Sequence, residues 1–267
     1  MGTASKMRRA RATAIRRAAL LAVSCGFLTA CAPPVPVSAP AEIASLPADF
    51  PASHYRQAEA RGERVLRIDP QRSLVVVEVR RAGALARLGH DHVVASHDVE
   101  GFLALAEGRA DMYVALDRLA VDEPALRSEA GFDTQPTSDA VAGTRRNMLE
   151  KVLGTERFPF ALIRVARADA GRPDLSVAIT LHGATRAFEI PAQIETLPRG
   201  IAVSGRMTFK QTDFGIAPFS VFGGALRVED RLDLRFRILA TEIGNRPHTG
   251  DSHCRPISST IEQKCTT

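Results

Sequence analysis

Two histidines separated by one residue are the first feature of this sequence that could support chemistry. His90 and His92 flank Asp91. On an extended strand, side chains two positions apart share a face, with Cβ atoms roughly 6.5–7 Å apart by the strand rise. Two imidazoles at that spacing can bind one divalent metal ion, and His97, Asp91 or Asp98 could supply a third ligand.

Two other roles fit the same segment. In the first, Asp91 caps a turn and one histidine donates a hydrogen bond to a backbone carbonyl. In the second, His90, Asp91 and His92 form a polar mouth that contacts the head group of a ligand. Arg145 and Arg146, at the start of a predicted helix, could then face a phosphate. The sequence leaves the metal, structural and polar-mouth roles open.

Motifs of known catalytic sites are absent from the chain. It contains no Gly-x-Ser-x-Gly elbow, no glycine-rich phosphate loop and no His-Glu-x-x-His. Serine, histidine and aspartate all occur, but their spacing does not bring them together. The sequence therefore predicts a protein that is not an enzyme.

The segments that must position these residues alternate with a period of two. Apolar and polar side chains alternate most clearly over residues 73–81, 111–117, 173–181, 201–210 and 231–239. Weaker strands are predicted near residues 90–95, 99–106, 158–167 and 187–197. Strict alternation is typical of half-buried antiparallel strands, with one face toward a core and one toward water.

One helix is predicted between the strands. Residues 139–153 carry an apolar stripe that includes Met148, Leu149 and Val152, and Gly154 supplies a stop signal. About nine strands with one inserted helix indicate an all-β fold over residues 61–243, either a closed barrel or a sandwich.

The apolar face of these strands could serve either of two purposes. A barrel of about eight strands is either filled by its own side chains or holds one ligand, and alternation alone does not distinguish the two. The predicted interior consists of Val75, Val77, Val79, Val114, Leu116, Ile179, Val203, Met207, Phe209, Leu234 and Phe236.

The positive charge of the chain belongs to its first residues. The sequence has 35 Lys and Arg against 30 Asp and Glu, a net charge of +5. Six of the basic residues and no acidic residue lie within residues 1–30, which leaves 29 basic against 30 acidic residues in the remainder. A nucleic-acid partner requires a basic surface on the folded domain, so this class of function is excluded.

Residues 1–30 are predicted to be a signal peptide of the lipoprotein type. A basic stretch to Arg17 is followed by an apolar stretch from Ala18 to Ala30. The four residues from Leu28 to Cys31 resemble a bacterial lipobox, which implies cleavage before Cys31 and acylation of its thiol. We therefore expect a periplasm-facing lipoprotein anchored to a membrane of the bacterial envelope.

Two further segments flank the predicted domain. Residues 31–60 are rich in proline and alanine, which predicts an extended linker without a core. Residues 244–267 form a polar tail. In an oxidising compartment, Cys254 and Cys265 of this tail could pair as a disulfide.

Several short segments, taken in order, resemble one known family. They are Arg67-Ile68-Asp69-Pro70, Met148-Leu149-Glu150 with Phe158-Pro159-Phe160, Ile179 to Arg186, Gly205 to Phe209 and Thr212-Asp213-Phe214-Gly215-Ile216. From about Arg67 to about Thr241, the chain resembles the YceI-like family of lipid- and polyisoprenoid-binding proteins.

The resemblance implies an extended antiparallel, lipocalin-like β-barrel of about eight strands with one inserted helix. It also implies a long apolar tunnel that holds a polyprenyl chain in the best-understood members. The chain departs from those members at Leu88 to Val94 and at Val221 to Val228.

The sequence thus predicts an envelope lipoprotein that binds or carries a long apolar molecule, such as a polyisoprenoid or another lipid, without catalysing a reaction. No cofactor is predicted with certainty. Two alternatives stay open at this point. One is a metal- or haem-handling protein that uses His90 and His92. The other is a solidly packed interaction module.

Overall fold

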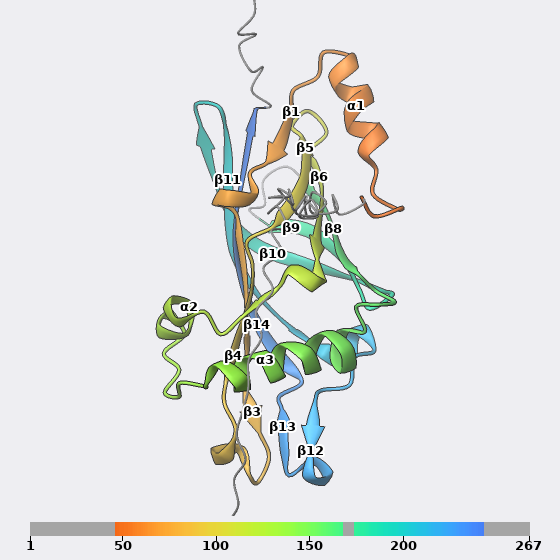
Figure 1. Cartoon of the computed structure of the whole chain (residues 1–267). Coiled ribbons are helices and arrows are strands. Elements are labelled where there is room, and N and C mark those ends of the chain that lie inside the picture. Colours follow the sequence, from red (N-terminus) through yellow and green to blue (C-terminus); the bar gives the residue numbers. More distant parts are fainter. Residues whose placement is uncertain (1–45, 168–173, 243–267) are drawn as a thin grey trace, which may run out of the picture. The chain divides into compact units, whose positions relative to one another are not determined.

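A computed structural model of the chain describes residues 46–167 and 174–242 (Figure 1). The predicted signal peptide, Cys31, Cys254 and Cys265 lie outside the described residues.

Eight antiparallel strands form a closed barrel, which confirms the predicted all-β fold class. The sheet closes because β1 pairs with β5 on one edge and with β14 on the other. In spatial order, the strands are β1 (Val65–Ile68), β5 (Val99–Ala104), β6 (Arg109–Ala115), β8 (Phe160–Arg167), β9 (Asp174–Leu181), β10 (Ala184–Leu197), β11 (Gly200–Lys210) and β14 (Arg231–Glu242).

The long strand β14 carries a second branch of the sheet. Its first half pairs with β2 (Leu74–Val79), with Leu234 opposite Val77, while its last residues pair with β1. From β2 the sheet continues to β4 (His92–Ser96) and β7 (Ala120–Val121). At the end of the barrel where β14 begins, β2, β4 and β7 therefore continue the wall.

The predicted helix over residues 139–153 is confirmed. Helix α3 (Ser138–Asn147) leads directly into a π-helical segment, Met148–Leu153, and packs on β7. The helical segment ends at Gly154, whose φ of +56° is a left-handed conformation that glycine adopts without steric cost. Figure 1 shows α3 lying across the lower half of the barrel.

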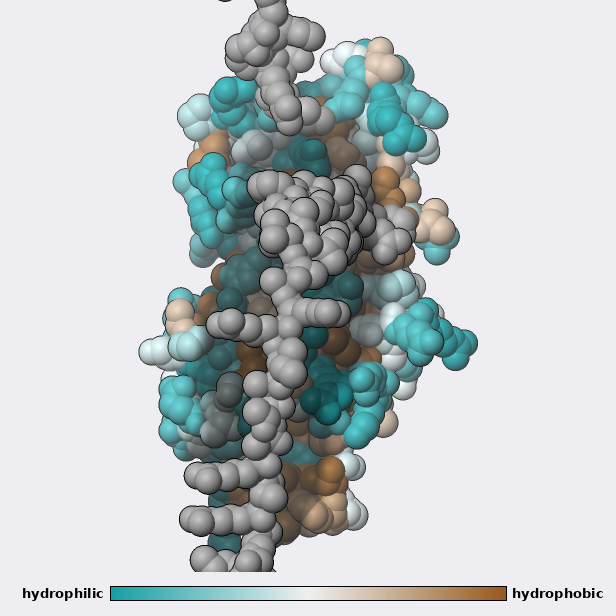
Figure 2. Space-filling view, viewed as in Figure 1, coloured by the Kyte–Doolittle hydropathy of each residue, from teal (hydrophilic) through white to brown (hydrophobic). Residues whose placement is uncertain are grey.

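A small sheet extends from the same end. It consists of β12 (Ser220–Val221), β13 (Leu226–Val228) and β3 (Arg81–Ala82). Turns beside it carry two exposed large apolar side chains, Leu88 and Phe222. Figure 2 shows brown, apolar surface at this lower end.

The structure has more helix than the sequence predicted, because the outer face of the sheet is also covered. Helix α2 (Pro124–Glu129) packs on the outer side chains of β2 and β4, where Val76 and Val93 are buried with Leu126 and Phe132. The prediction of one inserted helix therefore left out the helix α2. The expectation that one sheet face meets water is wrong where α2 lies.

The prediction that residues 31–60 form an extended linker is wrong for its last residues, 52–60. Helix α1 (Ala52–Ala60) packs on the barrel, with Tyr55 and Ala58 buried against the outer face of β1 and β5. The Tyr55 ring stacks on Phe102, with ring centroids 5.3 Å apart. The proline-rich composition of residues 31–60 hid this short amphipathic segment.

A buried carboxylate holds α1 in place. Asp111 on β6 is only 3% exposed and accepts hydrogen bonds from the Tyr55 hydroxyl at 2.7 Å, Arg109 Nε at 2.8 Å and Arg164 Nε at 3.0 Å. Burial alone would raise the pKa of Asp111, but these three hydrogen bonds lower it below its usual value. Asp111 points outward, as its alternation with Met112 predicts, yet α1 shields it from water.

Among residues 46–167 and 174–242, no helix has both the length and the apolar character needed to span a membrane.

Candidate functional site: a hollow barrel with one polar end

The barrel interior is a cavity of about 800 Å³. Every side chain predicted to lie inside the barrel, from Val75 on β2 to Phe236 on β14, is in its wall. Strands β2, β6, β9, β11 and β14 alternate as their sequences predict, because the period of two sends one parity of side chains inward. Small-molecule sites have volumes of about 300–1,000 Å³. The cavity in this barrel falls within that range, so it does not fit the alternative of a solidly packed interaction module.

The helical segment also contributes to the cavity wall. Met148, Val152 and Leu153 face the interior, as do Thr144 and Asn147 of α3. The apolar stripe seen in the sequence predicted that this helix is amphipathic. It did not predict that the buried side would close a ligand-sized cavity instead of packing on a filled sheet.

His92 brings an imidazole into this apolar wall. It is the first residue of β4, opposite Val79 of β2, and its side chain is 15% exposed. His92 Nδ1 lies 2.6 Å from Asp122 Oδ2. Because an ionised carboxylate only accepts hydrogen bonds, Nδ1 carries a proton and donates a hydrogen bond to Asp122.

Asp122 is the centre of a buried polar cluster behind this histidine. Its side chain is fully shielded, and it also accepts hydrogen bonds from the Val93 N–H at 3.0 Å and from Arg127 Nη1 at 2.6 Å. Burial alone would raise the pKa of Asp122. The hydrogen bonds from His92, Val93 and Arg127 outweigh it and hold the pKa below its usual value. The residue has a φ of +57°, a left-handed conformation that aspartate tolerates better than most residues.

Arg127 of α2 balances the charge of this carboxylate. Its side chain is 1% exposed. The guanidinium also donates to the backbone carbonyls of Asp91 and Thr134, and its Cζ lies 5.4 Å from the centre of the Phe132 ring. Neither Asp122 nor Arg127 was among the residues predicted from the sequence. Only a pairing of β4 with β7 brings them to His92, and β7 has two residues and no alternation to detect.

The three residues of the predicted polar mouth separate in the structure. His90 lies before β4, not on it, so the expectation that both histidines share one strand face is wrong. Its ring centre is 6.4 Å from that of His92, and its Nδ1 is buried without a partner among the described residues. Asp91 instead accepts a hydrogen bond from the Arg81 N–H at 2.8 Å. Of the three, only His92 lines the cavity.

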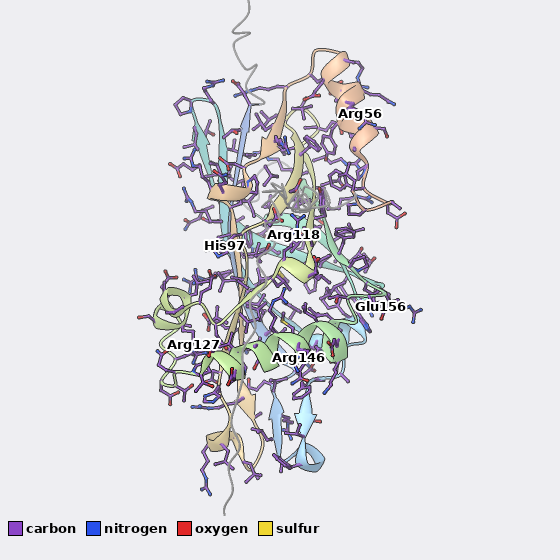
Figure 3. The ribbon with its side chains drawn as sticks, in the orientation of Figure 1. Arg56, His97, Arg118, Arg127, Arg146 and Glu156 are labelled. Carbon is purple, nitrogen blue, oxygen red and sulfur yellow. The ribbon has the colours of Figure 1, made fainter. Side chains whose placement is uncertain are left out.

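The predicted third metal ligands are engaged elsewhere. His97 Nε2 lies 2.8 Å from Glu123 Oε2, and Asp98 pairs with Arg118. In the described parts of the chain, no three His, Cys, Asp or Glu side chains are grouped so that they could hold a metal ion. Figure 3 shows His97 and Arg118 well above Arg127 in the view.

The prediction that Arg145 and Arg146 lie at the start of a helix is also wrong. Arg145 and Arg146 belong to the last turn of α3, not to its start. Arg145 donates hydrogen bonds to the backbone carbonyls of Asp117 and Leu119, so its guanidinium ties the helix to the segment before β7.

Comparison with known proteins gives the class to which this fold and cavity belong. A family model described as the YceI-like domain matches residues 66–240, and the chain belongs to this family. It is a binding family and not a catalytic one, in line with the prediction that the protein is not an enzyme. No curated protein matches the chain.

Solved structures resemble the fold at low sequence identity. A polyisoprenoid binding domain from Saccharophagus degradans, implicated in plant cell wall breakdown, is 12% identical with a TM-score of 0.48, over 66% of this chain and 98% of that one. BcnA of Burkholderia cenocepacia is 14% identical with a TM-score of 0.46, over 65% of this chain and 99% of that one. A YceI protein of Campylobacter jejuni is 11% identical with a TM-score of 0.38, over 51% of this chain and 73% of that one.

Removing the negative charge of Asp122 should lower the free energy of unfolding by a large amount. Asp122→Asn keeps the shape of the side chain but leaves the Arg127 guanidinium without a counter-charge, which costs about 3–5 kcal/mol for a buried pair. Asp98→Asn, which breaks the partly exposed pair with Arg118, should cost less than about 1 kcal/mol. Denaturant unfolding of the full chain at pH 7 measures both.

The pH dependence provides a second check. Because the folded-state pKa of Asp122 is lowered, its contribution is complete above the usual value of 3.8 and is lost as the pH falls below it. The stability gap between the wild type and Asp122→Asn should therefore still be present at pH 5 and should shrink as the pH falls below 3.8. Equal costs for the two variants would contradict the account.

Proposed function

We propose that this protein binds or carries a long apolar molecule, such as a polyisoprenoid or another lipid, inside its barrel. The observation that carries the proposal is the cavity of about 800 Å³ whose wall is made of inward-facing Val, Leu, Ile, Met and Phe side chains. An apolar chain inside it is removed from water without any directed contact.

The physical basis of binding is burial. Each methylene group transferred from water contributes about 0.8 kcal/mol, so a chain of ten methylenes contributes about 8 kcal/mol before the cost of association is subtracted. Affinity should rise with chain length until the cavity is filled. This mechanism requires no reaction and no cofactor.

A tryptophan directed into the cavity should prevent loading. Val203 of β11 and Val77 of β2 both face the interior. Val203→Trp and Val77→Trp fill the space that the ligand needs, and we expect at least a tenfold loss of affinity for a C16 chain. Displacement of a fluorescent apolar probe by hexadecan-1-ol measures this effect.

The matched control places the same side chain on the outside of the same strand. Arg206 is exposed on β11, and Arg206→Trp should leave the affinity unchanged. Circular dichroism and denaturant unfolding verify that all three variants fold. Undiminished binding by the folded Val203→Trp and Val77→Trp variants would show that the ligand does not occupy this cavity.

We further propose that the protein acts in the bacterial envelope as a lipoprotein. The support is the order of the first residues: a basic stretch to Arg17, an apolar stretch to Ala30, and Cys31 directly after it. Acyl chains on Cys31 would hold the barrel at a membrane surface without a spanning segment.

Cys31→Ser tests the anchor. The wild type expressed in bacteria should incorporate labelled palmitate and sediment with membranes, whereas Cys31→Ser should incorporate none. Cys25→Ser, inside the leader, is the control and should keep the label. Label retained by Cys31→Ser would refute the anchor without touching the proposal for the cavity.

A further inference from the structure

The cavity wall contains very few ionisable groups. Among the described side chains that line it, in residues 46–167 and 174–242, only His92 and Arg167 can carry a charge. His92 lies at the end of the barrel where β14 begins. Its partner on β2 is Val79, and the neighbouring Glu78 pairs with Asp233 near the start of β14. Arg167 belongs to the other end, beyond the pairing of Arg109 with Ala166.

These two groups differ in their surroundings. Arg167 is exposed to solvent at the end of β8, where an ionic contact is worth little. The His92 side chain is 15% exposed and is fixed by its hydrogen bond to a fully shielded carboxylate. Fixed and partly desolvated groups bind charged ligands more strongly than exposed ones.

The orientation of the imidazole leaves one nitrogen for a ligand. Nδ1 donates to Asp122, and Nε2, on the opposite side of the ring, has no hydrogen-bond partner among the described residues. The neighbouring charged groups are already engaged: Asp122 with Arg127, Asp91 with Arg81 and Arg145 with backbone carbonyls. His90 is the remaining titratable neighbour, 6.4 Å away between ring centres.

With Nδ1–H directed at Asp122, a ligand oxygen beside Nε2 would complete the second hydrogen bond of the ring, and an imidazole that donates on both sides carries a positive charge. Arg127 already balances the charge of Asp122, so the group at Nε2 must supply the negative charge that balances the ring. An anionic oxygen on the ligand would supply that charge.

We infer that His92 is the recognition site for the head group of the bound molecule, and that this head group presents an anionic oxygen, as a carboxylate or a phosphate does. His92 Nε2–H donates to that oxygen while the apolar chain of the same molecule extends along the barrel. This inference rests on the proposed binding of a long chain and specifies the class of that molecule as an acidic amphiphile.

The test compares probes with one chain and different heads. Hexadecanoate, hexadecyl phosphate and hexadecan-1-ol compete for the fluorescent probe on the full chain at pH 7, with inorganic phosphate as a head group without a chain. We expect at least one of the two anionic probes to bind tenfold or more tightly than the alcohol. The preference between carboxylate and phosphate then identifies the head, and inorganic phosphate alone should not compete.

The variant His92→Asn isolates Nε2. The asparagine amide can still donate to Asp122 from the position of Nδ1, but nothing replaces Nε2. We expect the anionic probes to lose their advantage over hexadecan-1-ol, while the alcohol itself binds as before. His97→Asn, outside the cavity wall, is the control and should keep the preference. Arg167→Gln removes the other ionisable group of the wall and tests whether that group selects the head instead.

Each result has a distinct meaning. An unchanged preference in His92→Asn, a loss of preference in Arg167→Gln, or competition by inorganic phosphate alone would overturn the role of His92. Equal affinities of all three long-chain probes for the wild type would overturn it as well, while leaving the proposed function intact. Failure of every long-chain probe to bind, the alcohol included, would refute the proposed function and the inference together.

Discussion

Strand β14 is hydrogen-bonded along both of its edges, and the rest of the structure depends on this pairing. One edge is matched to β11 from Arg231 to Thr241, and the other is shared between β1 and β2. A sheet closed in this way has an inside and an outside, so the period-two alternation of each strand becomes a single apolar lining. A register slip of one residue in β14 would turn Leu234 and Phe236 outward and direct Asp233 and Arg235 into the cavity.

The polar cluster at His92 follows from the second branch of that sheet. Because β2 continues to β4 and β7, residues separated by 30 positions meet, and Asp122 reaches the imidazole of His92. The wall of the cavity is apolar along its length and has one fixed, partly shielded nitrogen, His92 Nε2, at one end. This distribution of polarity matches that of an amphiphile, with an apolar chain and a polar head. In the complex that we propose, burial holds the apolar chain and one directed contact holds the head group.

Much of the barrel could be predicted from sequence because the relevant signal is local. Val75, Val77 and Val79, or Leu234 and Phe236, carry their inward direction in the spacing of neighbouring residues. The Gly154 stop and the stripe around Met148 likewise marked the helix. The hollow interior could not be predicted from the pattern, since a filled core uses the same residue types; only the family resemblance pointed to it.

The parts that sequence reasoning missed depend on contacts between distant segments. Tyr55 lies in a region whose composition predicts a linker. It folds onto the barrel because its ring packs on Phe102 and its hydroxyl donates a hydrogen bond to Asp111. Arg127 could be recognised as a structural charge only after Asp122 was placed beside it. His90 and His92 seemed equivalent in sequence, yet the strand begins at His92, and this single boundary decides which histidine reaches the cavity.

Native mass spectrometry tests the central claim most directly. The full chain, produced in bacteria with its leader intact and purified without a metal-affinity tag, is measured before and after extraction with organic solvent. The account predicts an excess mass that extraction removes and that corresponds to a molecule with a long apolar chain. A mass that organic extraction leaves unchanged, and that also stays unchanged after incubation with excess hexadecan-1-ol and hexadecanoate, would contradict it.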